Sequence, residues 1–327
     1  MLTRRHLVAT PLACAASALL QPRARAQEAE WPGRPVTVIV PWPPGGPTDA
    51  FARLISQRLS TDLGRSFVVD NRGGANGTIG MTAAARMRPD GYTVVITPNS
   101  TYAIAPHLYQ LGYDNERAFV GVSLLVSSPL FMLVPKDSPV RSVAEYVALA
   151  RRPGARQDYA NAGVGATSHL ATEMFLQMAG IQVNEVGYRG GGPAIQAVLA
   201  GEAGMFFMPA AAVMSYIQSG DLRALAATTR ERSPLAPAVP TFQELGFDGF
   251  EVVEHVGLLA PAGTPEPILR RLNEAAAAAL RAPDMQPRLQ AMAVTPEARP
   301  MAEWPAYFRA ENDKWRDFVK ARNIRVQ

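Results

Sequence analysis

Four junctions in the sequence place glycine, serine or threonine where an apolar stretch ends, and they are the strongest candidates for chemistry. Glycine permits a positive φ and lets a ligand approach the main chain. The first turn of a helix offers unpaired N–H groups and a partial positive charge. A single junction of this kind is more often a plain tight turn than a ligand site, but four of them at strand ends predict an anion site. They are PPGGPTD (43–49), PNST (98–101), NAGVGATS (161–168) and GYRGGGP (187–193).

One of these junctions, GVGATS, is close to a dinucleotide-binding fingerprint. Gly163, Gly165 and Ser168 have a similar spacing, and Glu185 follows about 20 residues later. The third glycine is missing, however, and Glu185 begins its predicted strand, where the fingerprint needs an acid at a strand end. We therefore predict no bound NAD or FAD and no other cofactor.

Residues for catalysis are sparse. Beyond residue 26 the chain has only His107, His169 and His255 and no cysteine, and it contains no G-x-S-x-G or H-E-x-x-H motif. We predict no catalytic residues, no metal site and no enzymatic activity. A dispersed Ser/His/Asp arrangement remains an alternative, because a single sequence does not reveal one.

The first 26 residues predict a secretory signal peptide. Arg4 and Arg5 precede an apolar stretch, and Ala24-Arg25-Ala26 predicts cleavage after Ala26 and a periplasmic location. The segment TRRHL also resembles a twin-arginine export signal. Lipidation at Cys14 is an alternative, but Pro11 fits a lipobox poorly.

Cleavage changes the charge balance. The chain has 32 basic and 28 acidic residues, and the signal carries four arginines and no acid, which leaves 28 of each. A neutral mature chain gives no argument for binding nucleic acid or an anionic membrane. Cys14, the only cysteine, is removed with the signal, so the mature chain can form no disulfide.

Short β-branched runs alternate with amphipathic helices along the rest of the chain. Clear strands are expected at 36–42, 92–98 and 129–135, and two long helices at 264–283 and 304–322. This alternation predicts an α/β protein with mostly parallel sheets. Because about 300 residues are many for one open sheet, we expect two lobes.

Eight segments carry a family resemblance, and they occur in the order PGGPTD, VVDNRGGANGTIG, RPDGYT, GVGATSHLATEMF, YRGGGPAIQAVLAGE, SGDLRALAATTRERS, VPTFQELG and LLAPAGTPEPILRRLN. Together they resemble the periplasmic solute-binding receptors of tripartite tricarboxylate transporters, also called Bug receptors. The resemblance implies a type II-like Venus-flytrap fold of two α/β lobes, joined by crossover strands around a central cleft. It also implies a monomeric receptor that captures a small organic acid and hands it to a membrane permease.

The resemblance and two apolar strands suggest where the lobes divide. We expect lobe one to take 27–130 and 255–327, and lobe two to take 131–254, with 129–135 and 256–261 crossing between them. Loops from both halves bear anion-holding chemistry, so we expect the lobes to close on the ligand.

In the resembled family, backbone N–H groups, hydroxyls and ordered waters hold the ligand carboxylate. Carried over to this sequence, the predicted ligand-binding residues are Trp42, Pro44, Gly45, Gly46, Thr48, Asp49, Ser100, Thr101, Ala162, Gly163, Val164, Gly165, Thr167, Ser168, Met208, Pro209 and His255.

The sequence also departs from the family pattern. Many relatives have an acid where this chain reads Met208-Pro209-Ala210, and many have a tryptophan at the position of His255. We therefore expect a ligand without an ammonium group, with an apolar body beside Trp42 and Met208. If His255 faces the cleft, affinity for a carboxylate should rise as the pH falls from about 8 to 6; a structural histidine is the alternative.

Two other functions stay open on the sequence alone. A receptor of this fold can serve a sensor kinase in place of a permease, and an exported enzyme of unknown reaction is also compatible with the signal peptide. Neighbouring permease genes would favour transport, and turnover of a substrate would favour an enzyme.

Overall fold

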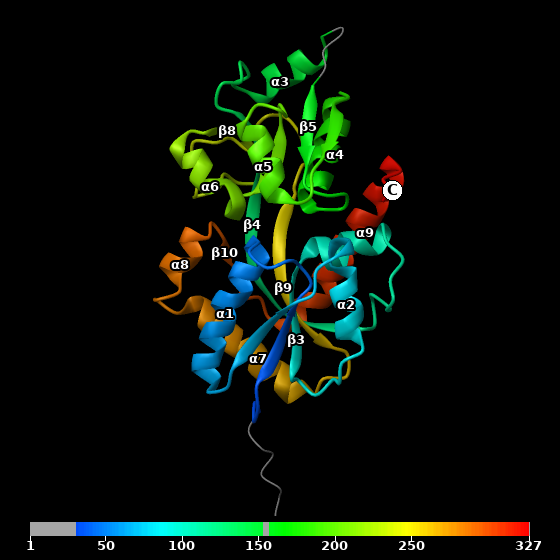
Figure 1. Ribbon diagram of the computed structural model, residues 1–327, viewed down its shortest axis with the longest axis vertical. Coiled ribbons are helices and arrows are strands. Elements are labelled where there is room, and N and C mark those ends of the chain that lie inside the picture. Colours follow the sequence, from blue (N-terminus) through cyan, green and yellow to red (C-terminus); the bar gives the residue numbers. More distant parts are fainter. Residues whose placement is uncertain (1–30, 153–156, 327) are drawn as a thin grey trace, which may run out of the picture.

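The computed structural model describes residues 31–152 and 157–326. The expected signal peptide, with its cleavage after Ala26, the twin-arginine segment and Cys14, lies outside the described residues. Within them the chain forms two α/β lobes stacked along the long axis of the molecule, as the sequence predicts (Figure 1).

Lobe one is built from the N-terminal and C-terminal parts of the described chain. Its strands are β1 (Val36–Val40), β2 (Phe67–Asn71), β3 (Thr93–Pro98), the first part of β4 (Phe119–Pro135), β9 (Val253–Pro261) and β10 (Thr295–Pro296). Its helices are α1 (Pro47–Leu63), α2 (Thr78–Ala85), α7 (Glu266–Arg281), α8 (Gln286–Ala291) and α9 (Trp304–Arg322), with short helical turns at η1 (Ala75–Gly77), η2 (Ser100–Ile104), η3 (Ala105–His107) and η4 (Met301–Glu303).

Lobe two is built from the middle of the chain. Its strands are the second part of β4, β5 (Asp158–Asn161), β6 (Asn184–Gly187), β7 (Phe206–Pro209) and β8 (Leu222–Ala227). Its helices are α3 (Val143–Ala150), α4 (Thr167–Ala179), α5 (Gly191–Leu199) and α6 (Ala210–Ser219).

The sheet of lobe one has the order β10-β4-β9-β3-β1-β2. Strand β1 pairs in parallel with β2 and β3, whereas β9 pairs antiparallel with both β3 and β4. The expectation of mostly parallel sheets is therefore correct for β1 to β3 and for β5 with β6 in lobe two, and wrong for the pairs that β4 and β9 form. The reason is the crossover: one strand leaves the lobe and another returns, so the two run in opposite directions.

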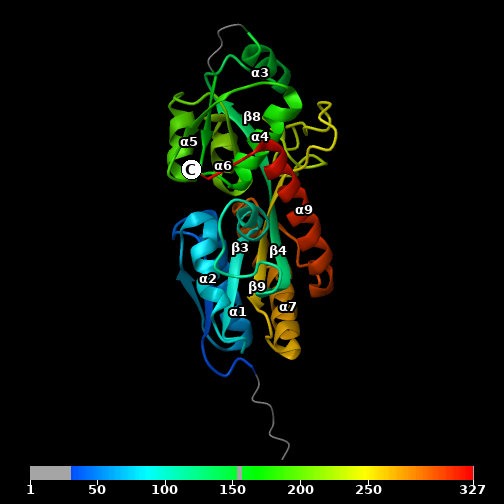
Figure 2. The ribbon, with the colours of Figure 1, turned by 90° about the vertical axis from the view of Figure 1, so that its right-hand side faces the viewer.

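Strand β4 connects the lobes through a single 17-residue run. Residues 119–129 pair with β9 in lobe one, and residues 130–135 pair with β7 and β8 in lobe two. The sequence pattern predicts a strand only at 129–135. Figures 1 and 2 show β4 and β9 running side by side between the lobes.

Side chains alternate between the two faces of β1, so neighbouring residues pack in two different hydrophobic cores. Val38 packs in the cluster beneath α1 and α7, whereas Ile39 packs in the cluster that includes residues of α2 and α9. This second cluster continues into lobe two, where it includes Phe175 and Phe207. Helix α9 runs alongside β4 and β9 (Figure 2), and its Arg322 forms an ion pair with Glu173 of α4 at 2.7 Å. The C-terminal helix therefore ties the two lobes together.

Among the described helices, none combines the length and apolar character needed to cross a membrane.

Candidate functional site

The loop before α1 is held in place by a single carboxylate. Gly45 has a φ of 84°, and α1 begins immediately after Gly46, which contributes no side-chain cap. Asp49, in the first turn, accepts hydrogen bonds from the Gly45 N–H at 2.9 Å, from Arg53 Nε at 3.0 Å and from Asn71 Nδ2 at 3.0 Å. Burial raises the pKa of Asp49, but these hydrogen bonds outweigh it, and the pKa lies below its usual value. The carboxylate is thus occupied by protein donors.

Trp42 and the loop after β3 form a second fixed part of lobe one. The Trp42 Nε1–H donates to Thr101 Oγ1 at 3.0 Å. Ser100 and Thr101 are buried in η2, the π-helical turn that follows β3. Trp42 and Thr101, both predicted for the site, are therefore brought into direct contact.

The second predicted loop enters α4 from lobe two. Gly163 and Gly165 have φ values of 146° and 84°, which favour glycine. The Gly165 N–H donates to His169 Nδ1 at 3.3 Å, so this nitrogen is unprotonated. Burial lowers the pKa of His169, although Glu185 and Glu173 oppose the shift, and we treat His169 as a neutral support of the loop. The hydroxyl of Thr167 is buried without a hydrogen-bond partner among the described residues.

This loop touches lobe one directly. Asn76 Nδ2 donates to the Gly165 carbonyl oxygen at 2.8 Å, and the Tyr109 hydroxyl donates to the Val164 carbonyl at 3.4 Å. A Cβ at Gly165 would lie 2.6 Å from Leu108 Cδ1, so the two surfaces meet without room for a side chain. Neither Asn76 nor Tyr109 is among the residues predicted from sequence.

The third element from lobe two is the start of α6. Strand β7 ends at Pro209, which precedes the helix, and Met208 is buried with its side chain against Gly191. The Ala211 N–H donates to Ser128 Oγ of β4 at 3.4 Å. This hydrogen bond fixes the N-terminus of α6 to the crossover strand.

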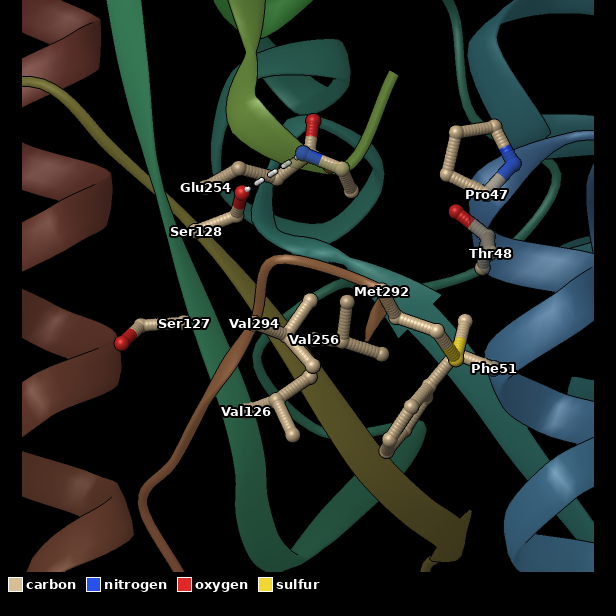
Figure 3. Close-up of a pocket in the computed structure, with 11 residues that line it drawn as sticks. Pro47, Thr48, Phe51, Val126, Ser127, Ser128, Glu254, Val256, Met292 and Val294 are labelled. Atoms are coloured by element: carbon tan, nitrogen blue, oxygen red, sulfur yellow. Dashed lines mark hydrogen bonds between the residues drawn. The ribbon is translucent and has the colours of Figure 1, made fainter. Parts of the chain in front are cut away.

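A cavity lies where α1, α6 and the crossover strands meet. Figure 3 shows Pro47 and Thr48 on α1 across from Ser128, with Val126, Val256 and Val294 below. Its volume is about 10 Å³, room for about one water-sized group, and it is partly open to solvent. The lining residues are Pro47, Thr48, Phe51, Val126, Ser127, Ser128, Ala211, Glu254, Val256, Met292 and Val294.

The polar groups in this cavity are few. Thr48 is buried, and its hydroxyl has no hydrogen-bond partner among the described residues. Glu254 lies on β9 directly across from Ser128 of β4. Burial raises the pKa of the Glu254 carboxyl to about 7. Sequence reasoning missed Ser128 and Glu254, although polar residues within apolar crossover strands were a signal that could have found them.

His255 is on the other side of the sheet from this cavity. Its neighbours along β9, Glu254 and Val256, line the cavity, and side chains alternate along a strand. The His255 ring instead packs edge-on against Tyr307 of α9, with ring centroids 5.3 Å apart. Its Nδ1 is buried without a partner among the described residues, and burial lowers its pKa against the opposing effect of Glu311.

The described residues include no cluster of three or more side chains able to hold a metal ion. The arrangement instead offers neutral donors. The first turns of α1 and α6 line one cavity, and the first turn of α4 follows a loop that contacts the opposite lobe. Such donors bind an anion without a cationic partner.

Comparison with known proteins found sequence relatives and similar solved structures. The model of the family described as tripartite tricarboxylate transporter family receptor matches residues 51–324. Protein BugT of Bordetella pertussis is 33% identical over 300 residues, which cover 91% of this chain and 92% of BugT.

Two solved structures from Rhodopseudomonas palustris show the same fold. A protein with adipate is 34% identical, with a TM-score of 0.83, and the match covers 90% of this chain and 100% of that one. The protein MatC with bound malate is 32% identical, with a TM-score of 0.79, and the match covers 88% of this chain and 99% of that one.

Proposed function

Because the chain belongs to the tripartite tricarboxylate transporter receptor family, we propose that it is an extracytoplasmic receptor that captures a small organic carboxylate between its lobes and delivers it to a membrane permease. Receptors of this family are periplasmic binding proteins, and two related structures hold adipate and malate. The proposal includes export with cleavage after Ala26, a monomeric receptor and no catalytic step.

One structural observation gives the proposal its main support. The first turns of α1 and α6, from different lobes, line the same cavity, and the Thr48 hydroxyl there has no partner among the described residues. Helix N-termini and free hydroxyls suit a carboxylate, which needs several donors at once. On this proposal, Thr48 and the nearby main-chain N–H groups hold the acid from lobe one.

The second loop supports the same assignment from lobe two. The unpartnered Thr167 hydroxyl opens α4, and no atom lies within 4 Å of a Cβ added at Gly163, so side chains leave the main chain open there. We assign ligand contacts to 162–168 and to 43–48, with Trp42 and Asp49 shaping the first loop from behind. Since His255 packs against α9, we leave it out of the proposed contacts.

We also propose the domain division 27–130 with 255–327, and 131–254. The change of pairing partners along β4 at residues 129–130 supports this boundary. Ligand binding would then close the two lobes about β4 and β9, which are the crossovers.

The test starts with the protein as purified from the periplasm. Native mass spectrometry identifies any small molecule that remains bound, and titration calorimetry then measures binding of succinate, malate, adipate and short monocarboxylates. We expect micromolar or tighter binding of at least one carboxylate and a smaller radius of gyration in its complex. A bound solute without a carboxylate, combined with no binding of any acid, would contradict the proposal.

A further inference from the structure

Glu254 stands out because it is an acid in a cavity suited to an anion. It lines the cavity together with Thr48 of α1 and Ala211 of α6, and it lies directly across from Ser128 in the β4–β9 pair. No hydrogen bond or ion pair to its carboxyl is formed by any described residue. Ser128 does not supply one, because its hydroxyl donates to the Ala293 carbonyl oxygen at 3.4 Å and accepts from the Ala211 N–H.

The surroundings of Glu254 provide no positive charge. Among the eleven lining residues, Glu254 is the only ionisable one, and the others are apolar or carry a hydroxyl. On the elements that pack behind β9, one titratable group interacts electrostatically with Glu254, and it is Tyr102 of η2. Burial raises the pKa of Tyr102, and the charges of Glu311 and Glu254 raise it further. His255, the next residue, turns to α9. Burial alone raises the pKa of Glu254 to about 7.

An unpaired carboxylate is costly in such a place, because partial burial removes some of its water without supplying another partner. A ligand group that donates hydrogen bonds would supply the partner. A second ligand carboxylate would instead bring two acids together with no cation between them, and one of them would have to be protonated.

From the position of Glu254 in the cavity and its lack of any partner among the described residues, we propose that this residue selects, among carboxylate ligands, those that also carry a hydroxyl or ammonium group. The proposal rests on the proposed function, because it assumes that a polar group of the ligand enters this cavity. The proposal replaces the expectation of a ligand without an ammonium group. That expectation rested on the missing acid at 208–210, after β7, whereas Glu254 of β9 supplies an acid in the cavity.

The test compares ligands that differ in one group only. Succinate, malate and aspartate share a four-carbon diacid and carry hydrogen, hydroxyl and ammonium at the second carbon; adipate and 2-aminoadipate form a longer pair. Calorimetry at pH 8 should show the donor-bearing member of a series binding at least about tenfold tighter than its parent, the value of one charge-assisted hydrogen bond. Malate against aspartate distinguishes the hydroxyl from the ammonium group.

Glu254→Gln removes the charge at nearly constant shape. In this variant the preference for the donor-bearing acid should shrink at least about fivefold. In the wild type, the preference for the donor-bearing acid should be larger at pH 8 than at pH 6, because ionised Glu254 is the better hydrogen-bond acceptor. In Glu254→Gln this preference should not change with pH. Glu251→Gln is the matched control, since Glu251 pairs with Arg230 near the surface at 2.8 Å, outside the cavity.

The possible results separate the two proposals. Tight binding of these acids with the same preference in wild type and Glu254→Gln would overturn the role of Glu254 and leave the proposed function intact. A wild-type preference for the donor-bearing acid that is the same at pH 6 and pH 8 would also overturn it, because the charge of Glu254 would then have no part in the selection. Failure of every carboxylate to bind would overturn both proposals.

Discussion

The side-chain amide of Asn76 in lobe one donates a hydrogen bond to the main-chain carbonyl oxygen of Gly165 in lobe two, with 2.8 Å between nitrogen and oxygen. Asn76 has a φ of 51° and a ψ of 35°, a left-handed conformation that asparagine tolerates better than most residues. The backbone thus directs this amide across the gap between the lobes. The contact belongs to the arrangement in which the lobes lie together.

Replacing Asn76 by glycine should favour separation of the lobes. Glycine keeps the left-handed backbone accessible, so the main loss is the hydrogen bond to Gly165, at 2.8 Å, and a longer one to the Ser100 carbonyl oxygen, at 3.4 Å; each such bond typically contributes about 0.5–1.5 kcal/mol. We expect the affinity for a bound carboxylate to fall roughly three- to tenfold, because ligand binding must then supply the closure energy. The ligand-free variant should also show a larger radius of gyration by X-ray scattering.

Asn323→Gly provides the control for this prediction. Asn323 has nearly the same backbone conformation, with a φ of 51° and a ψ of 38°, but it lies at the exposed end of α9. Its replacement should leave affinity and radius unchanged. If Asn76→Gly matches this control in both measurements, the interlobe hydrogen bond has no role in closure.

Gly165→Ala tests the same contact from the other lobe. The new Cβ would lie 2.6 Å from Leu108 Cδ1 and 3.0 Å from Asn76 Nδ2, and the φ of 84° is itself unfavourable for alanine. We expect ligand binding to weaken at least tenfold. The free energy of unfolding should change little, because the lobes can move apart and separate the new Cβ from Leu108. Gly187→Ala is the control, because no atom lies within 4 Å of its added Cβ. Wild-type affinity in Gly165→Ala would show that the loops need not touch in the complex.

The fold could be predicted well from sequence, since the strands and helices of lobe one have strong periodicity. Helix 304–322 was expected with the bounds that the structure shows, and β1 differs only by ending at Val40. The first half of β4 could not be found, because its serines and glycine weaken a continuous apolar pattern. The antiparallel pairing followed from the crossover, which is a property of chain path and has no local sequence signal.

The candidate site could be predicted only in part. Loops 43–49 and 161–168 were identifiable from their glycines and hydroxyls, but which polar groups face the cavity depends on strand register. In β9 the alternation places Glu254 in the cavity and His255 behind it, and a shift of one residue would exchange them. The partner of Gly165, Asn76, lies 89 residues earlier in the chain, so only the tertiary structure reveals it.

Asp49 should matter for the shape of its loop. Asp49→Ala removes the acceptor for Gly45, Arg53 and Asn71, and we expect a loss of about 1–3 kcal/mol in the free energy of unfolding together with weaker ligand binding. Asp62→Ala is the control on the same helix, where Asp62 pairs with Arg58 at 2.8 Å and both are partly exposed. It should cost less than about 1 kcal/mol. Equal stability losses in chemical denaturation would contradict this role of Asp49.

The pH dependence of stability should separate His255 from Glu254, because their pKa values move in opposite directions. Burial lowers the pKa of His255 below its usual 6.5, so the unfolded chain takes up this proton first and stability is lost as the pH falls below about 6.5. Burial raises the pKa of Glu254 from 4.5 to about 7, so the folded chain holds that proton longer. Stability from this group is therefore present at low pH and is lost as the pH rises from about 4.5 to 7.

Denaturant unfolding of wild type, His255→Gln and Glu254→Gln at several pH values from 5 to 7.5 measures both effects. Each group changes the slope of the unfolding free energy by at most about 1.4 kcal/mol per pH unit. Relative to wild type, His255→Gln should lose less stability on acidification and Glu254→Gln should lose more. Ligand affinity in His255→Gln should follow the pH profile of the wild type, since the ring packs on Tyr307. If His255→Gln changes how ligand affinity depends on pH but not how the unfolding free energy depends on pH, then His255 acts in ligand binding.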